Sequence, residues 1–569
     1  MKPLFSKKIR FVRQGDQGNV RFGNPPQIHN AVLLYVFLLF MGFSFLILSL
    51  RLFQLNIVKG GYYLRLSEEN RLRELVIEAK RGTILDRKGF VLAENQEADI
   101  NKIADRISSR RVYRAKEEAA HLVGYRQIAD KADLSADNCT NKLQLGDRVG
   151  KKGLEQLFEC DLRGVAGKKL VEVDARGKYL KTITVIPPIT GKTVKLAVDL
   201  DLQRVAYEAI QRQRAAVVAL SPKTGEVLVF ASSPSFDPQK FEDGDKSVMD
   251  YFTADDKPLF NRLTEASYPP GSIFKLFVAS GVLEEKKMTV KDIIEDTGSI
   301  KAGSLSFGNW YFLQYGKTEG PVDMIKALRR SNDIYFYKAG EKLGPEGIKK
   351  WAGTFGLTKK TGIGFQEVEG LIPSPFWKEE ALKERWYLGD TYNTSIGQGY
   401  TLVSPLQIAF GVLPFANNGY LCNPHLIKDA PAECKQVPVS RHTLDTIREG
   451  MKEACSPGGT GWPLFNFSVL NHTLIQQTLA KTPDEKKASV EAAIKRQPSY
   501  SKQIQTACKT GTAESHGEST APHAWFTVFA PFDDPEIMVT VLVEEGGQGS
   551  DVAAPIAREI LKAYFERIE

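Results

Sequence analysis

Several cofactor-binding patterns are missing from the 569-residue sequence. It contains no G-x-x-x-x-G-K-[ST] phosphate loop, and no G-x-G-x-x-G motif follows a predicted strand. Its seven histidines form no H-E-x-x-H or H-x-x-x-H pattern, and its six cysteines form no C-x-x-C pair. We therefore expect no metal site and no cofactor. Collagen-like, disordered and multi-span membrane proteins are excluded by a composition with 42% hydrophobic and 25% charged residues.

Long apolar runs are scarce as well, and only residues 31–50 form one (AVLLYVFLLFMGFSFLILSL). Twenty helical residues cover about 30 Å, which is the thickness of a hydrocarbon core. The run is longer than the apolar region of a signal peptide, about 7–15 residues, and no Ala-x-Ala cleavage pattern follows it. We therefore expect an uncleaved membrane anchor over residues 30–52, in preference to a signal peptide or a buried helix.

Acidic residues are nearly absent from the N-terminus. Residues 1–30 carry six Lys and Arg but a single acid, Asp16. The whole chain has 76 Lys and Arg against 68 Asp and Glu, so more than half of its net charge of +8 precedes the apolar run. A basic flank stays in the cytoplasm. The sequence thus predicts a cytoplasmic tail over 1–29, a single pass through the inner (plasma) membrane, an extracytoplasmic remainder and no nucleic-acid partner.

The six cysteines are an even set in an exported chain, which permits disulfides. Six cysteines allow fifteen connectivities, so the sequence does not fix the pairing. Cys422 and Cys434 are near neighbours in sequence and are the best candidates for a pair. The alternative that most of the cysteines are free and buried stays open.

The first exported segment combines a helix with β-rich stretches. Residues 56–80 have the pattern of a polar amphipathic helix, and two short β-rich runs within 81–92 predict a hairpin. Residues 101–150 are charged and mixed, with helical stretches such as 112–122, and residues 170–174 predict another strand.

The composition shifts near residue 199, where we place the start of a large C-terminal domain. A helix over 202–213 precedes a nearly all-apolar run at 215–220, which is typical of a central buried strand, and a second strand at 227–231. At the far end, 524–530 and 537–544 predict a hairpin and 552–568 a closing helix. Strands at both ends with helices between them favour an α+β fold with an antiparallel sheet flanked by helices.

Three short motifs in this domain carry candidate chemistry. Ser272 and Lys275 lie three residues apart at the start of a helix expected over 273–283, so they share one face. A serine hydroxyl needs a neighbouring base to become a nucleophile, and a desolvated lysine can be that base. Alone, Ser272 could be only a helix N-cap.

The second and third motifs do not indicate a catalytic function when each is taken alone. The triplet at 331–333 (SND) is also typical of a turn or an N-cap, and the triplet at 509–511 (KTG) is typical of a surface turn. A lysine beside hydroxyls and a glycine nevertheless suits binding of a substrate carboxylate at a strand edge. Together, and in this order, S-x-x-K, S-x-[ND] and K-T-G mark the active-site serine penicillin-recognising enzymes.

The chain resembles the class B penicillin-binding proteins, in particular the elongation-type group known as penicillin-binding protein 2. Besides the three motifs, the resemblance rests on further segments: 70–71 (NR), 81–87 (RGTILDR), 153–155 (GLE), 162–164 (LRG), 261–262 (NR), 268–272 (YPPGS), 395–400 (SIGQGY), 404–407 (SPLQ), 523–526 (HAWF) and 553–555 (AAP). It implies an extended β-rich pedestal (dimerisation-like) domain over 53–198. It also implies a transpeptidase domain with a serine β-lactamase-like fold over 199–569.

The activity implied by the resemblance is that of a peptidoglycan D,D-transpeptidase, which cross-links stem peptides during cell elongation and is inhibited by β-lactams. Ser272 would attack the penultimate D-Ala carbonyl, with Lys275 as general base, and Ser331 would relay the proton to the leaving amine. Backbone N–H groups of Ser272 and Thr512 would form the oxyanion hole. The resemblance assigns catalytic roles to Ser272, Lys275, Ser331 and Asp333, and substrate-binding roles to Asn332, Lys509, Thr510, Gly511 and Thr512.

The partners implied are stem peptides as D-Ala-D-Ala donor and amine acceptor, β-lactams, the membrane, a SEDS-family glycan polymerase and other proteins of the elongation complex. The sequence also departs from the family pattern. Asp333 stands where Asn is usual, which favours the elongation group and leaves the partner of Lys275 open, and Cys508 stands where Gly usually precedes the third motif. The stretch 461–505 is longer than usual and predicts an inserted helix over 480–496.

Other functions remain as alternatives. A septal (division) class B transpeptidase would share the chemistry, but Asp333 and the run at 523–526 disfavour it. A β-lactam sensor or hydrolase is a second alternative, and the long pedestal and anchor argue against a hydrolase. A non-catalytic scaffold in wall synthesis is a third, although all three motifs are intact. Some elongation-type relatives carry a zinc cluster, but residues 334–398 contain no Cys or His, so we predict no zinc.

Overall fold

The computed structural model describes residues 31–96, 106–174, 176–482, 486–487, 494, 497–515 and 521–566. The chain forms two compact units: the described residues of Met1–Glu74 with Leu170–Thr184, and Leu75–Lys169 with Val185–Glu569.

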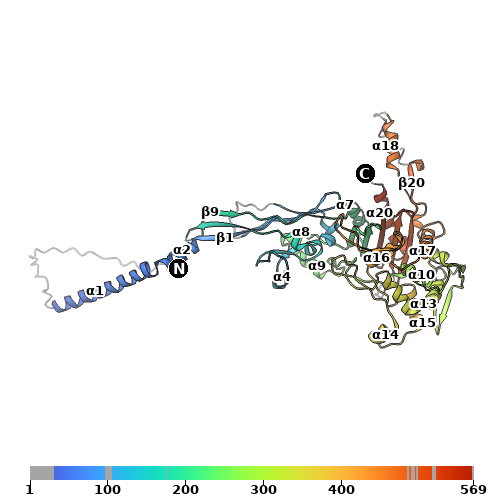
Figure 1. Cartoon of the computed structure of the whole chain (residues 1–569), viewed down its shortest axis with the longest axis horizontal. Helices are drawn as coiled ribbons and strands as arrows, with labels where there is room; N and C mark the ends of the chain where they lie inside the picture. The colour runs from blue at the N-terminus through green and yellow to red at the C-terminus, as the bar shows by residue number, and fades with distance from the viewer. Residues whose placement is uncertain are drawn as a thin grey trace, which may run out of the picture. The chain divides into compact units, whose positions relative to one another are not determined.

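The first unit contains the apolar helix that the sequence predicts. Helix α1 (Ala31–Phe53) continues through a π-helical turn, η1 (Gln54–Val58), and all of its described side chains lie outside any core. Over Ala31–Val58 the helix is long and apolar enough to cross a membrane. Helix α2 (Gly60–Arg71) follows, and strands β8 (Gly167–Val173) and β9 (Tyr179–Ile186) are neighbours in a sheet. Figure 1 shows α1 and α2 in blue.

Two expected helices of the exported segment are wrong in part. The helix predicted over 56–80 ends at Arg71, and Leu72–Ile77 is strand β1, because Leu75 and Ile77 alternate into the interior with the period of a strand. The helix predicted over 112–122 is replaced by strand β5 (Arg111–Tyr113) and two short helical turns. Tyr113 pairs with Ala93 on strand β3 (Val91–Asn95), and Lys116 has a positive φ of 42° that interrupts a helix.

The hairpin predicted within 81–92 is present as β2 (Ile84–Leu85) and β3 (Val91–Asn95), which pair antiparallel in the sheet β10-β2-β3-β5. The other elements before residue 199 are η2 (Lys116–Ala119), α3 (Ala120–Val123), α4 (Lys131–Ala136), α5 (Gly153–Leu157), α6 (Glu159–Leu162), β4 (Arg106–Ile107), β6 (Arg126–Ile128), β7 (Arg148–Gly150) and β10 (Val194–Lys195).

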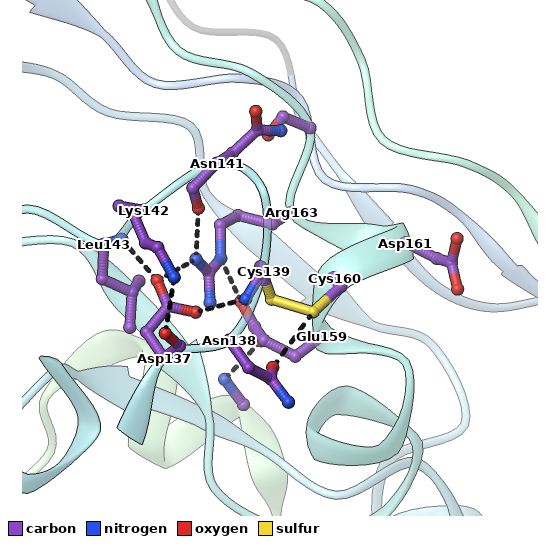
Figure 2. Close-up of a disulfide and its surroundings, with 12 residues drawn as sticks. Asp137, Asn138, Cys139, Asn141, Lys142, Leu143, Glu159, Cys160, Asp161 and Arg163 are labelled. Atoms are coloured by element: carbon purple, nitrogen blue, oxygen red, sulfur yellow. Dashed lines mark hydrogen bonds and ion pairs between the residues drawn. A yellow bond between two sulfur atoms is a disulfide. The ribbon is translucent and has the colours of Figure 1, made fainter. Parts of the chain in front are cut away.

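All six cysteines form disulfides, so the alternative of free cysteines is wrong. The predicted Cys422–Cys434 pair joins strands β17 (Tyr420–Cys422) and β18 (Cys434–Gln436). The Cys139–Cys160 bridge lies beside the guanidinium of Arg163, which donates to Asp137 Oδ2 at 2.9 Å and to the carbonyl of Asn141 at 2.6 Å (Figure 2). The third bridge joins Cys455 to Cys508.

A five-stranded antiparallel sheet, in the order β12-β11-β23-β22-β21, lies at the centre of the C-terminal part, as predicted. Its strands are β11 (Ala215–Leu220), β12 (Val227–Ser233), β21 (Ala507–Ala513), β22 (His523–Ala530) and β23 (Ile537–Val543). Every residue of β11 is buried, in agreement with its apolar run. The first and last thirds of this part therefore meet in one sheet, and β21 forms its edge.

Helices cover both faces of this sheet. Ala215, Val217 and Ala219 face a core with α7 (Leu200–Ile210) and α20 (Ala554–Phe565), which match the predicted helices at both ends. Ala216 and Val218 face a larger core with the central helices α10 (Lys275–Glu284), α13 (Asp333–Thr354), α16 (Pro405–Ala416) and α17 (Arg441–Ala454). This alternation along β11 is the period of a strand buried on both sides.

The remaining elements connect or flank these layers. They are α8 (Pro238–Asp243), α9 (Val248–Thr253), η3 (Gly271–Phe274), β13 (Ile294–Asp296), β14 (Ser299–Ala302), β15 (Leu305–Gly308), α11 (Trp310–Tyr315), β16 (Gly320–Val322), α12 (Met324–Arg330), α14 (Pro375–Leu382), α15 (Leu388–Ser395), η4 (Trp462–Leu464), β19 (Ser468–Leu470), α18 (His472–Ala480), η6 (Pro498–Tyr500), β20 (Ser501–Gln503) and η7 (Gly549–Ala553). Most of the helix expected over 480–496 lies outside the described residues.

Candidate active site

The three sequence motifs, separated by up to 237 positions, lie around one cleft with a volume of about 520 Å³. The first motif is on η3 and α10, the second joins α12 to α13, and the third is on the edge strand β21. Five of the predicted residues line the cleft: Ser272, Ser331, Asp333, Thr510 and Thr512. Lys275 and Lys509 are fully buried behind this surface.

Ser272 lies in a tight turn, not in the first turn of an α-helix as the sequence predicts. The segment Gly271–Phe274 is a 3₁₀-helix, and α10 begins at Lys275. Gly271 has a φ of 55°, and a Cβ there would lie 2.8 Å from the carbonyl oxygen of Thr512 and 3.2 Å from its nitrogen. The glycine therefore allows the backbone of Ser272 to approach the backbone of Thr512, where two N–H groups can serve one oxyanion.

Lys275 is held by the second motif. Its Nζ donates to the carbonyl oxygen of Ser331 at 2.7 Å and to Asp333 Oδ1 at 2.6 Å, and it lies 3.4 Å from Ser331 Oγ. Burial lowers the pKa of Lys275, while the carboxylate of Asp333 opposes that shift. A lysine with a lowered pKa is more often neutral near pH 7 and can accept a proton. Asp333 thus answers the question of the lysine's partner that the sequence leaves open.

Lys509 approaches the same serine from the opposite motif. Its Nζ donates to Ser331 Oγ at 2.8 Å and to the carbonyl oxygen of Thr510 at 2.9 Å. Burial and the positive charge of Lys275 lower the pKa of Lys509 well below its ordinary value. Ser331 Oγ therefore accepts from one lysine and lies within reach of the other, which leaves its own hydrogen available to donate into the cleft.

The backbone of the second motif is unusual. Ser331 has a positive φ of 54° and ends helix α12 in the left-handed region, and Asn332 is the N-cap of α13, where its side chain accepts from Tyr335 N at 2.9 Å. The N-cap expected in this triplet is thus Asn332. Asn332 is fully buried and does not line the cleft, because its side-chain nitrogen donates to Asp296 Oδ2 at 2.8 Å.

The third motif presents hydroxyls along the sheet edge. Thr510 Oγ1 donates to Thr460 Oγ1 at 2.8 Å, and the carbonyl oxygen of Thr512 accepts from the side chain of Gln398 at 3.2 Å. At Gly511 a Cβ would lie 2.9 Å from Trp525 Cβ, so a side chain does not fit there. An edge strand with free positions on one side can pair with an extended peptide, and the hydroxyls can receive its carboxylate.

Sequence reasoning missed the segment between β13 and β16, which supports the second motif. Trp310 lines the cleft, and its backbone N donates to Asp333 Oδ2 at 2.9 Å. Asn309 Oδ1 accepts from Asp333 N at 3.1 Å, and Asn309 Nδ2 donates to Asp296 Oδ2 at 2.7 Å. No local sequence signal marks these residues, because their partners lie 13 to 36 positions away.

Within the described part of the chain, no group of three or more His, Cys, Asp or Glu side chains could hold a metal ion. The cleft brings together Ser272, a second serine, Ser331, between two buried lysines, and the carboxylate of Asp333.

Two family models match the chain. Residues 215–562 match the penicillin-binding protein transpeptidase domain, and residues 97–196 match the penicillin-binding protein dimerisation domain. The first match alone covers more than half of the sequence.

The chain is also similar to individual penicillin-binding proteins in sequence and in structure. The chain is 32% identical over 482 residues to the peptidoglycan D,D-transpeptidase MrdA of Haemophilus influenzae. The alignment covers 80% of this chain and 70% of that protein. A structure of Pseudomonas aeruginosa PBP2 in complex with WCK 5153 aligns with a TM-score of 0.69 at 29% identity, over 87% of this chain and 97% of that one. A complex between PBP2 and MreC from Helicobacter pylori aligns with a TM-score of 0.70 at 25% identity, over 87% and 99% of the two chains. The three assembled motifs and these similarities together establish that the chain belongs to the penicillin-binding proteins with a transpeptidase domain.

Proposed function

We propose that the protein is a peptidoglycan D,D-transpeptidase of the elongation type, which cross-links stem peptides through an acyl-enzyme on Ser272 and is inhibited by β-lactams. The observation that carries the proposal is the position of Ser331 Oγ, 2.8 Å from Lys509 Nζ and 3.4 Å from Lys275 Nζ, in a cleft that Ser272 also lines. The similarity to MrdA over most of the chain supports the same reaction.

Acylation begins when neutral Lys275 accepts the hydroxyl proton of Ser272. The serine oxygen then attacks the penultimate D-Ala carbonyl, and the backbone N–H groups of Ser272 and Thr512 stabilise the negative charge that develops on the carbonyl oxygen. The C–N bond breaks as Ser331 passes a proton to the leaving amine and is reprotonated from the lysines. Terminal D-Ala leaves, and the donor peptide stays as an ester on Ser272.

The second half of the reaction uses the same groups in reverse. The amine of a neighbouring stem peptide attacks the ester carbonyl, and its proton returns through Ser331 and Lys275 to the oxygen of Ser272. Lys509, Thr510 and Thr512 orient the donor by its terminal carboxylate before acylation. A β-lactam mimics D-Ala-D-Ala and acylates Ser272 by the first half alone.

Two of the residue roles expected from the sequence change in this mechanism. Asn332 holds the second motif in place instead of binding substrate, since its side chain is buried against Asp296 and the backbone of Tyr335. Gly511 contributes by having no side chain, which leaves the space that Trp525 fills.

The rest of the chain serves to hold this site at the membrane. We propose a cytoplasmic tail over 1–29, an anchor over 30–52, a pedestal over 53–198 and a transpeptidase domain over 199–569 outside the cytoplasm. The apolar helix Ala31–Val58 and the basic residues before it support that orientation. Because a related PBP2 forms a complex with MreC, we include proteins of the elongation complex among the partners, with a SEDS-family glycan polymerase as the expected source of nascent strands.

Labelling with a fluorescent penicillin tests the assignment. We expect the full-length protein to be labelled and Ser272→Ala to remain unlabelled, because only Ser272 can form the ester. Ser280→Ala is the matched control: Ser280 is a buried serine of α10 whose hydroxyl donates to the carbonyl of Leu276 at 2.9 Å, so its loss should leave labelling intact. Labelling that survives in Ser272→Ala would overturn the assignment of the ester to Ser272, and an unlabelled wild type would favour the scaffold alternative.

Depletion of the protein in growing cells separates the two transpeptidase groups. The elongation assignment predicts rounded cells, because side-wall synthesis stops while division continues. Filamentous cells would instead support the septal alternative.

A further inference from the structure

We propose that Asp296 is a positioning residue for the transpeptidase reaction: its buried carboxylate holds Asn309 and Asn332, and these two residues fix Asp333 against Lys275. This inference rests on the proposed function, in which Lys275 is the general base. Asp296 lies at the end of β13 and does not itself reach the cleft.

The carboxylate of Asp296 accepts four hydrogen bonds. Its Oδ2 accepts from Asn309 Nδ2 at 2.7 Å, from Asn332 Nδ2 at 2.8 Å and from the backbone N of Glu319 at 3.1 Å. Its Oδ1 accepts from the backbone N of Gly298 at 2.8 Å. The side chain is 2% exposed, so these bonds replace water almost completely.

Asn309 connects this carboxylate to Asp333. While its Nδ2 donates to Asp296, its Oδ1 accepts from the backbone N of Asp333 at 3.1 Å. The next residue, Trp310, donates its backbone N to Asp333 Oδ2 at 2.9 Å. Asp333 is therefore held at its backbone and at one carboxylate oxygen, which leaves Oδ1 aimed at Lys275 Nζ, 2.6 Å away.

Asn332 makes the second connection. Its amide bridges Asp296 and the backbone N of Tyr335 in the first turn of α13, so it sets the point at which that helix begins. Ser331 and Asp333 flank it directly. The link through Asn309 therefore ends on Asp333, and the link through Asn332 ends on the residue between Ser331 and Asp333, whose polar groups both contact Lys275 Nζ.

A carboxylate is required at this position because all four partners are donors. An ionised Asp is an acceptor at both oxygens, whereas an Asn of the same shape would turn an N–H₂ group toward one set of donors. Asp296→Asn thus keeps the volume of the side chain and removes acceptor capacity in a buried site, where an unsatisfied group is costly.

The groups that face Lys275 define the expected pH response. They are the carboxylate of Asp333 and the hydroxyl and carbonyl of Ser331 from the second motif, the charge of Lys509 from β21, and the ring of Phe336, whose centroid is 5.5 Å from Nζ. Asp333 favours the protonated form of the lysine. If Asp333 is released, the pKa of Lys275 falls further, and the acidic limb of the acylation profile moves to lower pH.

The test measures the second-order rate of acylation by a fluorescent penicillin across pH, in full-length wild type and in Asp296→Asn. We expect a loss on the order of 10- to 100-fold, since a misplaced base costs rate, together with an acidic limb at lower pH. The matched control is Glu367→Gln, because Glu367 is also a buried carboxylate with N–H and O–H donors, at Thr361 and Gly362. That control should keep the wild-type limb.

An unchanged limb in Asp296→Asn overturns the inference, whether the rate falls or not, because a purely structural residue would lower the amount of folded protein without moving the limb. If Asp296→Asn does not fold, Asn309→Ala replaces it, since it removes the acceptor for Asp333 N while sparing Asp296. An unchanged acidic limb of the acylation profile in Asn309→Ala would likewise overturn the inference. Failure of the proposed function is seen separately, as a wild type that is not acylated on Ser272.

Discussion

At the scale of residues, two buried lysines meet at one serine that lines the cleft. Lys275 and Lys509 are fully buried and both contact Ser331, so their charges oppose each other as well as being desolvated. Asp333 is the carboxylate that offsets this repulsion, at 2.6 Å from Lys275. The departure from Asn to Asp in the second motif therefore has a physical role, because an amide would leave the lysines without a counter-charge.

A second buried group, His121, predicts how stability depends on pH. Burial lowers its pKa from 6.5 to about 4, and its ring lies 3.1 Å from the carbonyl of Pro234. His121 binds a proton at higher pH in the unfolded chain than in the folded chain. Its contribution to the free energy of unfolding is therefore fully present above pH 6.5 and is lost as the pH drops from 6.5 to 4. At 1.36 kcal/mol per unit, the loss amounts to about 3 kcal/mol.

His121→Gln isolates this contribution, since Gln offers a donor to Pro234 but does not titrate. Denaturant unfolding at pH 7 and at pH 4.5 should show a smaller acid loss in the variant than in the wild type. Parallel losses in the two proteins would mean that His121 is not held neutral in the folded state.

The residues of the site were predictable to the extent that they form local patterns. Ser272, Lys275, Ser331 and Lys509 stand in short motifs, and the structure brings all four together. Asp296 and Asn309 stand in no pattern, because their contacts depend on how β13, α11 and α13 meet in space. The motif predicts Asn332 as a substrate ligand, and in the structure its side chain is buried and bonded to Asp296 and to the backbone N of Tyr335.

At the scale of elements, a disulfide joins the edge strand β21 to the end of α17. Cys508, which replaces the usual glycine before Lys509, is bonded to Cys455 just past the end of α17. Both cysteines are buried, and Gly461 packs so closely on them that a Cβ there would lie 2.5 Å from Cys508 Sγ. The bridge thus ties the strand that carries Lys509 and Thr510 to the helix behind it.

Loss of this bridge should affect stability and activity together. The link joins residues 53 positions apart, and removing a bridge of this kind costs about 2–4 kcal/mol. We expect the Cys455→Ala/Cys508→Ala double variant to unfold more easily and to acylate more slowly per folded molecule, because β21 is less firmly placed. Denaturant unfolding and fluorescent penicillin kinetics measure the two effects.

The Cys139–Cys160 bridge (Figure 2) provides the matched control. Its loss also removes one disulfide, but the bridge lies outside the residues that match the transpeptidase domain. Cys139→Ala/Cys160→Ala should lower stability and leave the acylation rate per folded molecule at the wild-type value. Equal rates in the two double variants would contradict a positioning role for Cys455–Cys508.

Element prediction succeeded where one period dominates the sequence. The buried strand β11 and the helices α7 and α20 were recognisable from their apolar patterns. Strand β1 was not, because Leu72–Ile77 continues the charged pattern of α2 and its strand character depends on pairing with β4. No local pattern marks the 3₁₀ turn at Ser272, where Gly271 has a positive φ and a Cβ would lie 2.8 Å from the carbonyl oxygen of the distant Thr512.

At the scale of the whole molecule, the amino-acid composition indicates function only when the positions of the charged residues and of the three motifs are considered. The excess of positive charge is concentrated before an apolar helix, and the three motifs meet only when the two ends of the C-terminal part join one sheet. That sheet could be anticipated from strands at both ends of the domain. The cleft could not, because it is formed by η3, the α12–α13 link and β21 from three distant parts of the chain.

The proposed reaction requires that Ser272 form the covalent acyl-enzyme. Peptide mapping by mass spectrometry after reaction of the full-length protein with benzylpenicillin tests it most directly. We expect a single penicilloyl adduct, equal in mass to the added drug, on the peptide that contains Ser272 and localised to its hydroxyl by fragmentation. An adduct on another residue, or none on a folded protein, would contradict it.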